Sequence, residues 1–250
     1  MDFVYASRLD CNQCPGGFHL TMWALSVQEY IKFKRTQTQR EEGPPWVMDS
    51  DLVPAVVLAA GFSRRLGRPK ALVSVNGRTL IEWAHERLIA AGCHPVVVVN
   101  ASIESQVRAR LPTAHLVVNA DPDSGRTGSL QLGIHALSQT VERPLLRMVM
   151  VPVDRPCWNV EVVKTLLGHG GNAAASNEGR NGHPVVMMAD ALASVSAAKQ
   201  DTPLRDIVDF VGVPVHAPWL HMNIDTPDDV DRLMAQGTHL AACFSQSEGI

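Results

Sequence analysis

Residues 56–72 have the sequence VVLAAGFSRRLGRPKAL, in which an apolar run ends in a loop that contains glycine. The loop carries four basic side chains: Arg64, Arg65, Arg68 and Lys70. No acidic residue lies between Asp51 and Glu82. Backbone N–H groups and fixed positive charge placed just after a buried strand favour the binding of a polyphosphate. The stretch therefore predicts a phosphate site at the end of a strand.

Outward from this stretch, the chain alternates strand and helix signals. The continuous apolar run from Val53 to Ala59 is typical of a strand buried on both faces of a parallel sheet. Further strands are predicted at 95–100, 115–119, 145–153, 173–176 and 185–188. Helices are predicted at 80–91, 102–111, 129–140, 190–199 and 204–210, and two more helices are predicted to begin at about 159 and at 227. Short connections favour right-handed βαβ crossovers. The predicted fold is a three-layer, Rossmann-like α/β domain whose mostly parallel sheet has helices on both faces.

Two helix starts are specified by local sequence. Thr79 with Glu82, and Thr226 with Asp229, have the form of a capping box, in which the two residues satisfy each other's backbone N–H groups. The acidic residues around Thr226 serve this cap, with the exception of Asp225. Asp225 therefore lies at a strand end without a structural role, and it is a candidate ligand.

A second acidic candidate is Asp154, which follows the predicted strand at 145–153. Ligands of open α/β sheets bind outside the carboxyl ends of the strands, although Asp154 could also cap the helix near Asn159. Residues 121–123 have the form of a DxD metal motif, but Asp-Pro beside Ser-Gly is also typical of a turn, which we favour. Two carboxylates and a basic loop suit magnesium-assisted phosphoryl or nucleotidyl transfer. Neither a Walker A nor a GxGxxG motif occurs.

Composition argues against several classes of protein. The formal net charge of −3 disfavours a general nucleic-acid binder. No apolar run approaches the roughly 20 residues that span a bilayer, and the apolar patch near Met22 lacks the preceding basic region of a signal peptide. The five cysteines form an odd set without framework spacing, which favours a reducing compartment. We therefore expect a cytoplasmic protein with no membrane or nucleic-acid partner.

The expected organisation is an N-terminal extension at 1–50 that is poorly structured, a main domain at 51–238 and a frayed tail at 239–250. The extension contains one weakly helical piece, about Met22 to Phe33. Its Cys11-x-x-Cys14 pair has the spacing of a zinc or redox motif, but a four-ligand zinc site needs a second pair, and only His19 is near. We interpret the pair as incidental.

Residues 58–70, LAAGFSRRLGRPK, resemble the signature LAAGxSxRhGxxK of the MobA-like nucleotidyltransferases, a family that includes molybdenum cofactor cytidylyltransferases and guanylyltransferases. Further matches follow in the family's order: NGRTLI at 76–81, GSLQLG at 128–133, VDRP at 153–156, GHP at 182–184 and NIDTP at 223–227. The ordered set covers about Val53 to Met234. The resemblance is greatest to the molybdenum cofactor cytidylyltransferases, and it implies a fold of the nucleotide-diphospho-sugar transferase type at 51–238.

The resemblance implies that an acceptor phosphate attacks the α-phosphorus of a nucleoside triphosphate and releases pyrophosphate, with Mg²⁺ as cofactor. The implied nucleotide contacts are Leu58, Ala59, Ala60, Gly61, Ser63, Arg65 and Lys70. The implied catalytic set is Arg65, Lys70, Asp154 and Asp225, of which Asp154 and Asp225 would hold the metal. The implied acceptor contacts are Ser129, Gly182 and His183. The Ala-Ala-Gly form of the signature, with Ala60, favours CTP.

Two departures from the family pattern affect the acceptor. Arg155 stands where the cytidylyltransferases usually have glutamine or methionine, and Arg126 interrupts a loop that is normally small and polar. A second cation beside Asp154 could bind a more anionic acceptor or weaken metal binding. Molybdopterin cofactor is the first expectation for the acceptor, with a molybdoenzyme as a partner. The alternatives are a sugar- or polyol-phosphate cytidylyltransferase and a nucleotide-binding regulatory domain without turnover.

Met48 directly precedes the first predicted strand, which leads to the hypothesis that translation of the natural protein starts there. Mass spectrometry of the intact protein purified from its native cells tests this hypothesis. We expect a mass that begins at or just after Met48, and a full-length product would contradict it.

Overall fold

The computed structural model describes residues 52–140, 144–236 and 243. The extension predicted at 1–50, with its Cys11–Cys14 pair and its helical piece, lies outside the described residues, as does the tail at 239–250 apart from Cys243. The predictions for these segments therefore stay predictions.

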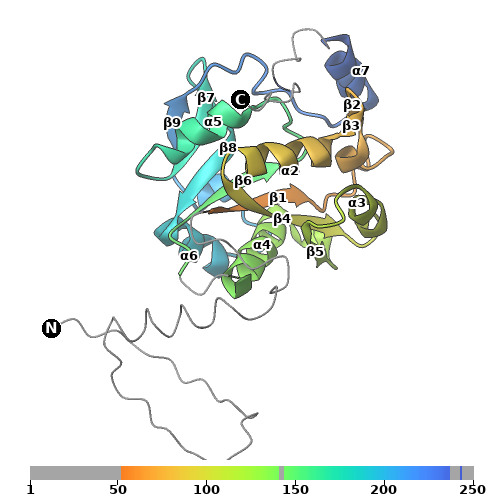
Figure 1. Ribbon diagram of the computed structural model, residues 1–250. Helices are drawn as coiled ribbons and strands as arrows, with labels where there is room; N and C mark the ends of the chain where they lie inside the picture. The colour runs from red at the N-terminus through yellow and green to blue at the C-terminus, as the bar shows by residue number, and fades with distance from the viewer. Residues whose placement is uncertain (1–51, 141–143, 237–242, 244–250) are drawn as a thin grey trace, which may run out of the picture. The chain divides into compact units, whose positions relative to one another are not determined.

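The core of the fold is a seven-stranded sheet with the order β5-β4-β1-β6-β8-β7-β9 (Figure 1). The strands are β1 (Val53–Ala59), β4 (Cys93–Asn100), β5 (His115–Asn119), β6 (Arg147–Pro152), β7 (Ala173–Asn177), β8 (Arg180–Met188) and β9 (Val211–Pro214). β1 pairs in parallel with β4 and β6, β4 with β5, and β7 with β9. Only β8 runs antiparallel to its neighbours β6 and β7. The predicted mostly parallel sheet is therefore confirmed.

Helices cover both faces of this sheet (Figure 1). They are α2 (Leu80–Ala90), α3 (Glu104–Arg110), α4 (Arg126–Thr140), α5 (Val160–Leu167), α6 (Ala189–Ala197) and α7 (Pro227–Ala235). Successive residues of β1 point to opposite faces, so Val57 packs in one apolar core with α2 and α5, and Val56 packs in the other with α4 and α6. Both valines are fully buried. This alternation produces the predicted three layers.

Local capping determines where several helices begin. The capping boxes of Thr79 with Glu82 and of Thr226 with Asp229 are both present, as predicted. At α5, the side chain of Asn159 accepts a hydrogen bond from the backbone N–H of Val162 at 3.0 Å. Asn159 is therefore the cap of α5, and the alternative structural role that we considered for Asp154 is not needed.

The polar segment at 177–184, which lies between the strands predicted at 173–176 and 185–188, is mostly a β-hairpin. Glu178 and Gly179 adopt positive φ angles of 53° and 75°, as the turn of a tight hairpin requires, and Arg180 pairs with Asn177 across it. The GHP match at 182–184 consequently lies within strand β8.

The prediction of a helix at 204–210 is wrong, except for its first turn. Only the 3₁₀ turn η3 (Leu204–Asp206) forms, and the chain then enters β9. β9 is an edge strand of four residues, none of which is buried. It contains Gly212 and Pro214, two residue types that strands disfavour, so its sequence gives a weak strand signal.

Gly133 marks the closest approach of α4 to the sheet. A Cβ atom at this position would lie 2.7 and 2.8 Å from the two methyl carbons of Val56, so a side chain there overpacks the core. We expect Gly133→Val to lower the free energy of unfolding by about 1–3 kcal/mol in urea denaturation. Gly170→Val is the control, because no atom lies within 4 Å of its Cβ position. Equal stability of the two variants would contradict the packing described here.

Candidate active site

A hollow of about 500 Å³ lies at the carboxyl ends of the parallel strands. It is enclosed by the loop after β1, the loop after β6 and the segment before α7. We call it the loop hollow. Its lining includes every residue expected to contact the nucleotide or the metal: Leu58, Ala59, Ala60, Gly61, Ser63, Arg65, Lys70, Asp154 and Asp225. β1 and β6 are adjacent parallel strands, so their carboxyl ends deliver both loops to the same place. The fold thus brings together residues that are far apart in the sequence.

Lys70 lies between the two acidic residues of the loop hollow. Its Nζ is 3.4 Å from Oδ2 of Asp154, and it also donates a hydrogen bond to Oδ1 of Asp225. Arg65 Nη2 donates to Oδ2 of Asp225 at 2.5 Å, and the amide of Asn223 donates to the same oxygen at 2.9 Å. Burial raises the pKa of Asp225, but these donors, with Lys70 first, bring it below its ordinary value. Both oxygens of Asp225 are therefore engaged by cations or amides.

The glycine-containing loop is held by its own hydrogen bonds. Ser63 has a positive φ of 55°, its carbonyl accepts from the N–H groups of Leu66 and Gly67, and its Oγ accepts from the N–H of Lys70 at 3.0 Å. Ser63 was expected to contact the nucleotide, and in the structure its hydroxyl positions the backbone of Lys70.

Asp154 offers the clearest position for a divalent cation. Its backbone carbonyl accepts from the N–H of Ile224 at 2.9 Å, which ties the loop after β6 to the segment that carries Asp225. Its Oδ1 is buried and has no hydrogen-bond partner. Within the described residues, no cluster of three or more His, Cys, Asp or Glu is placed to hold a metal. The donor set thus fits a metal bound mainly through Asp154 and through substrate oxygens, as Mg²⁺ commonly is.

Arg87 positions the loop that carries Asp154, and sequence reasoning did not find it. Its guanidinium lies over the rings of Trp83 and Trp158 at 5.3 and 5.5 Å and donates to the carbonyls of Pro156 and Trp158 at 2.8 and 2.7 Å. Burial lowers the pKa of Arg87 to about 10, so the side chain stays charged at neutral pH. The only signal in the sequence was a basic residue on the apolar face of a predicted helix.

Asn100 is a second residue that the sequence analysis missed. It ends β4, is buried, and donates from its side-chain amide to the carbonyl of Ala60 at 2.9 Å. It thereby fixes the backbone at the start of the glycine-containing loop. Its place at the carboxyl end of a parallel strand is the signal that could have identified it.

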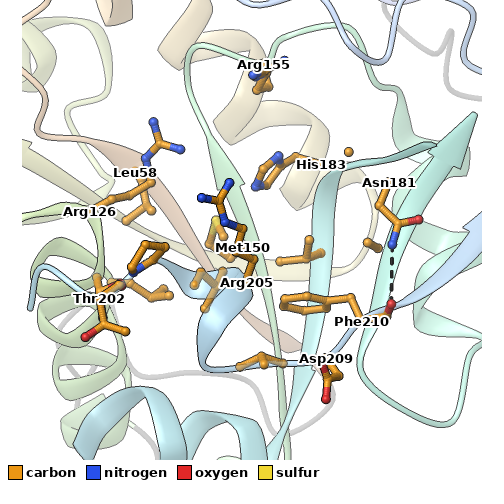
Figure 2. A pocket seen from close by; sticks show the side chains of 18 of the residues that line it. Leu58, Arg126, Met150, Arg155, Asn181, His183, Thr202, Arg205, Asp209 and Phe210 are labelled. Carbon is orange, nitrogen blue, oxygen red and sulfur yellow. Dashed lines mark hydrogen bonds between the residues drawn. The ribbon is translucent and has the colours of Figure 1, made fainter. Parts of the chain in front are cut away.

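A second hollow of about 720 Å³ adjoins the first, and we call it the arginine hollow (Figure 2). Its lining contains four arginines: Arg126, Arg155, Arg180 and Arg205. Gly182 and His183, two of the predicted acceptor contacts, also line it. Burial, and then the charges of Arg126 and Arg155, lower the pKa of His183 to about 4, while Asp154 opposes the shift. His183 is therefore neutral at pH 7.

Ser129 was expected to contact the acceptor together with Gly182 and His183, but it lies in a different hollow from these two residues. It lines the loop hollow and not the arginine hollow. It is buried in the first turn of α4, where its Oγ accepts from the side-chain amide of Asn119 at 2.9 Å. Its position is set by this internal hydrogen bond.

The segment at 121–123 forms part of a turn, as we favoured. The 3₁₀ turn η2 spans Pro122–Ser124, and Asp123 pairs with Arg64 at 2.8 Å, with both side chains exposed. Its carboxylate therefore faces an arginine of the glycine-containing loop and not the two acids of the loop hollow.

A family model described as "MobA-like NTP transferase domain" matches residues 55–217. The chain belongs to this family. Nicotine blue oxidoreductase of Paenarthrobacter nicotinovorans is 37% identical over 197 residues, which cover 72% of this chain and 91% of that protein. A molybdenum cofactor guanylyltransferase of Rhizobium johnstonii is 30% identical over 204 residues, which cover 73% of this chain and 92% of that protein.

The fold has solved counterparts. The crystal structure of a homologue of Mycobacterium tuberculosis Rv0371c, from Mycobacterium sp. strain JC1, superposes with a TM-score of 0.64 at 24% identity and covers 75% of this chain and 98% of that one. This likeness confirms the nucleotide-diphospho-sugar transferase type of fold. Within the described residues, no helix is long and apolar enough to cross a membrane.

Family membership supports an enzyme of the nucleotidyltransferase type. The preference for CTP that we based on Ala60 is not supported, because the curated relatives whose names mention the molybdenum cofactor are guanylyltransferases.

The depressed pKa of His183 makes folding stability depend on pH. Below about pH 6.5 the unfolded chain binds a proton at this position, whereas the folded chain does so only near pH 4, so stability falls as the pH falls through this interval. We expect His183→Asn to lessen the loss of unfolding free energy between pH 8 and pH 5 by up to about 2 kcal/mol. Urea denaturation at both pH values measures it, and an equal loss in the variant and the wild type would contradict a neutral His183.

Proposed function

We propose that residues 51–238 transfer a nucleotidyl group from a nucleoside triphosphate to a phosphorylated small-molecule acceptor and release pyrophosphate. The observation that carries this proposal is the meeting of Lys70 with Asp154 and Asp225 in the loop hollow. A cation and two carboxylates at the carboxyl edge of a sheet suit a reaction that depends on positioning and charge neutralisation.

Lys70 and Arg65 share one task in this proposal. Both side chains face the loop hollow, where the triphosphate would lie, and they stabilise the negative charge that develops on the departing pyrophosphate. Mg²⁺ bound at Asp154 and Asp225 supplies charge neutralisation at the phosphates. Because Lys70 neutralises both carboxylates in the structure, we expect it to turn from the carboxylates to the phosphates when substrate and metal bind.

The substrates follow from the relatives and from the second hollow. Guanylyltransferases among the relatives make GTP the first nucleotide to test, with CTP as the comparison. The acceptor would occupy the arginine hollow, and molybdopterin cofactor is the first candidate, with a molybdoenzyme as the recipient of the product. Sugar and polyol phosphates are the alternative acceptors.

A second candidate function rests on one observation, the 37% identity with nicotine blue oxidoreductase. An oxidoreductase would bind a reduced nicotinamide dinucleotide as its electron donor, with the pyrophosphate of that dinucleotide on the glycine-containing loop, and a planar dye in the arginine hollow. Hydride transfer does not need two carboxylates that bind a metal. The requirement for Asp225 therefore separates the two functions.

The test is pyrophosphate release from each of the four nucleoside triphosphates, with Mg²⁺ or Mn²⁺, in the presence of molybdopterin or sugar phosphates. We expect Lys70→Ala and Asp225→Asn to lower the rate at least about 100-fold, because each removes a preorganised charge, and to leave the circular dichroism spectrum unchanged. Arg68→Ala is the matched control, since Arg68 is exposed in the same loop and lines neither hollow.

Unchanged turnover in both active-site variants would refute these residue roles. Absence of pyrophosphate release with every pair, together with NADH- or NADPH-dependent reduction of a dye, would favour the oxidoreductase. Binding of nucleotide with neither activity would favour a regulatory domain.

A further inference from the structure

Three residues, Leu58, Arg126 and Arg155, line both hollows and so form the junction between them. In a nucleotidyl transfer, the attacking group of the acceptor and the α-phosphate of the nucleotide must meet at such a junction. The residues there are therefore the ones that contact the reacting end of the acceptor.

The fold brings both arginines of the junction close to Asp154. Arg126 is the first residue of α4, where the helix dipole adds positive character, and its Nη2 is 4.0 Å from Oδ2 of Asp154. Arg155 directly follows Asp154, and its Nη1 donates to the carbonyl of His221 at 2.8 Å. This hydrogen bond leaves most of the five guanidinium N–H groups of Arg155 for a ligand.

Positive charge exceeds negative charge at this junction. In and beside it, four cations face two carboxylates, which leaves an excess of two positive charges. The cations are Arg65, Lys70, Arg126 and Arg155, and the carboxylates are those of Asp154 and Asp225. The neighbouring His183 is neutral at pH 7. An anion with two negative charges would balance the excess, whereas a singly charged group would balance only half of it.

The lining of the arginine hollow beyond the junction combines apolar side chains with the charged Arg180, Arg205, Asp201 and Asp209. Its apolar lining includes Leu130, Met150, Val185, Phe210 and Leu220, of which Met150 and Phe210 are labelled in Figure 2. A ligand that fills this space therefore needs an apolar body attached to the group held at the junction. Inorganic phosphate alone would leave these side chains without a contact.

We infer that Arg126 and Arg155 form a clamp for the dianionic phosphate of a phosphate monoester with an apolar or aromatic body, and that this clamp selects the acceptor. Two guanidinium groups can present paired N–H donors to the phosphate oxygens, a geometry that favours phosphate over a group of lower charge. The inference rests on the proposed function, since it assigns the acceptor end of the same site.

Binding measured by calorimetry at pH 8 tests the clamp without requiring turnover. The probes are phenyl phosphate, which is dianionic at this pH, phenyl sulfate, which has a similar shape and one charge, and inorganic phosphate, which lacks the body. We expect the wild-type chain to bind phenyl phosphate at least about tenfold more tightly than either other probe, the difference that one charge-assisted hydrogen bond supplies.

Arg126→Ala and Arg155→Ala should each weaken the binding of phenyl phosphate about tenfold and that of phenyl sulfate by a smaller factor, because a guanidinium group attracts the dianion more strongly. Arg110→Ala is the control, because Arg110 is exposed at the end of α3 and lines neither hollow. Circular dichroism checks that each variant is folded.

Equal affinity of the wild type and both junction variants for phenyl phosphate would overturn the clamp, even if pyrophosphate release is observed. Loss of affinity in the junction variants without pyrophosphate release from any triphosphate would support the clamp and refute the proposed transfer. The phosphate clamp and the proposed nucleotidyl transfer can therefore be refuted independently of each other.

Discussion

The contact of Lys70 with Asp154 and Asp225 is the constraint on which the site depends. Two carboxylates that face each other in a partly buried hollow repel unless a cation lies between them. The surrounding structure serves to hold this arrangement. Ser63 fixes the backbone of Lys70, Arg87 fixes the loop that carries Asp154, and the cap of α7 fixes Asp225 through the backbone hydrogen bond to Asp229.

Features with local determinants could be predicted from the sequence. The bounds of β1 agree with the apolar run that defined it, and the capping boxes at Thr79 and Thr226 form as their spacing indicated. The grouping of Lys70 with Asp154 followed from one rule, that the carboxyl ends of parallel strands share an edge. These predictions needed no knowledge of which segments pair at a distance. Asp225 was expected at a strand end, but it lies in the segment before α7, a described part of the chain that contains no strand.

Features that depend on distant partners could not be predicted. β9 forms because it pairs with β7, although its own residues are not buried, and the hairpin at 177–184 depends on a turn formed by Glu178, which rarely adopts a positive φ. The role of Arg87 depends on two indole rings, one of them about 70 residues along the chain. The position of Ser129 in the loop hollow could not be predicted either, because the direction of its hydroxyl is set by Asn119.

The distance along the chain between the parts of the site has a consequence for biosynthesis. Lys70 and Asp225 are 155 residues apart, and the hydrogen bond from Ile224 to Asp154 forms only after the strands between them have assembled. Parallel strand pairings of this kind form slowly, because a long loop must close, with a loss of chain entropy, before its contacts can stabilise the structure. A chain still on the ribosome therefore displays the basic loop without its acidic counterpart. Until the segment before α7 emerges, this loop can attract anions but lacks the complete site.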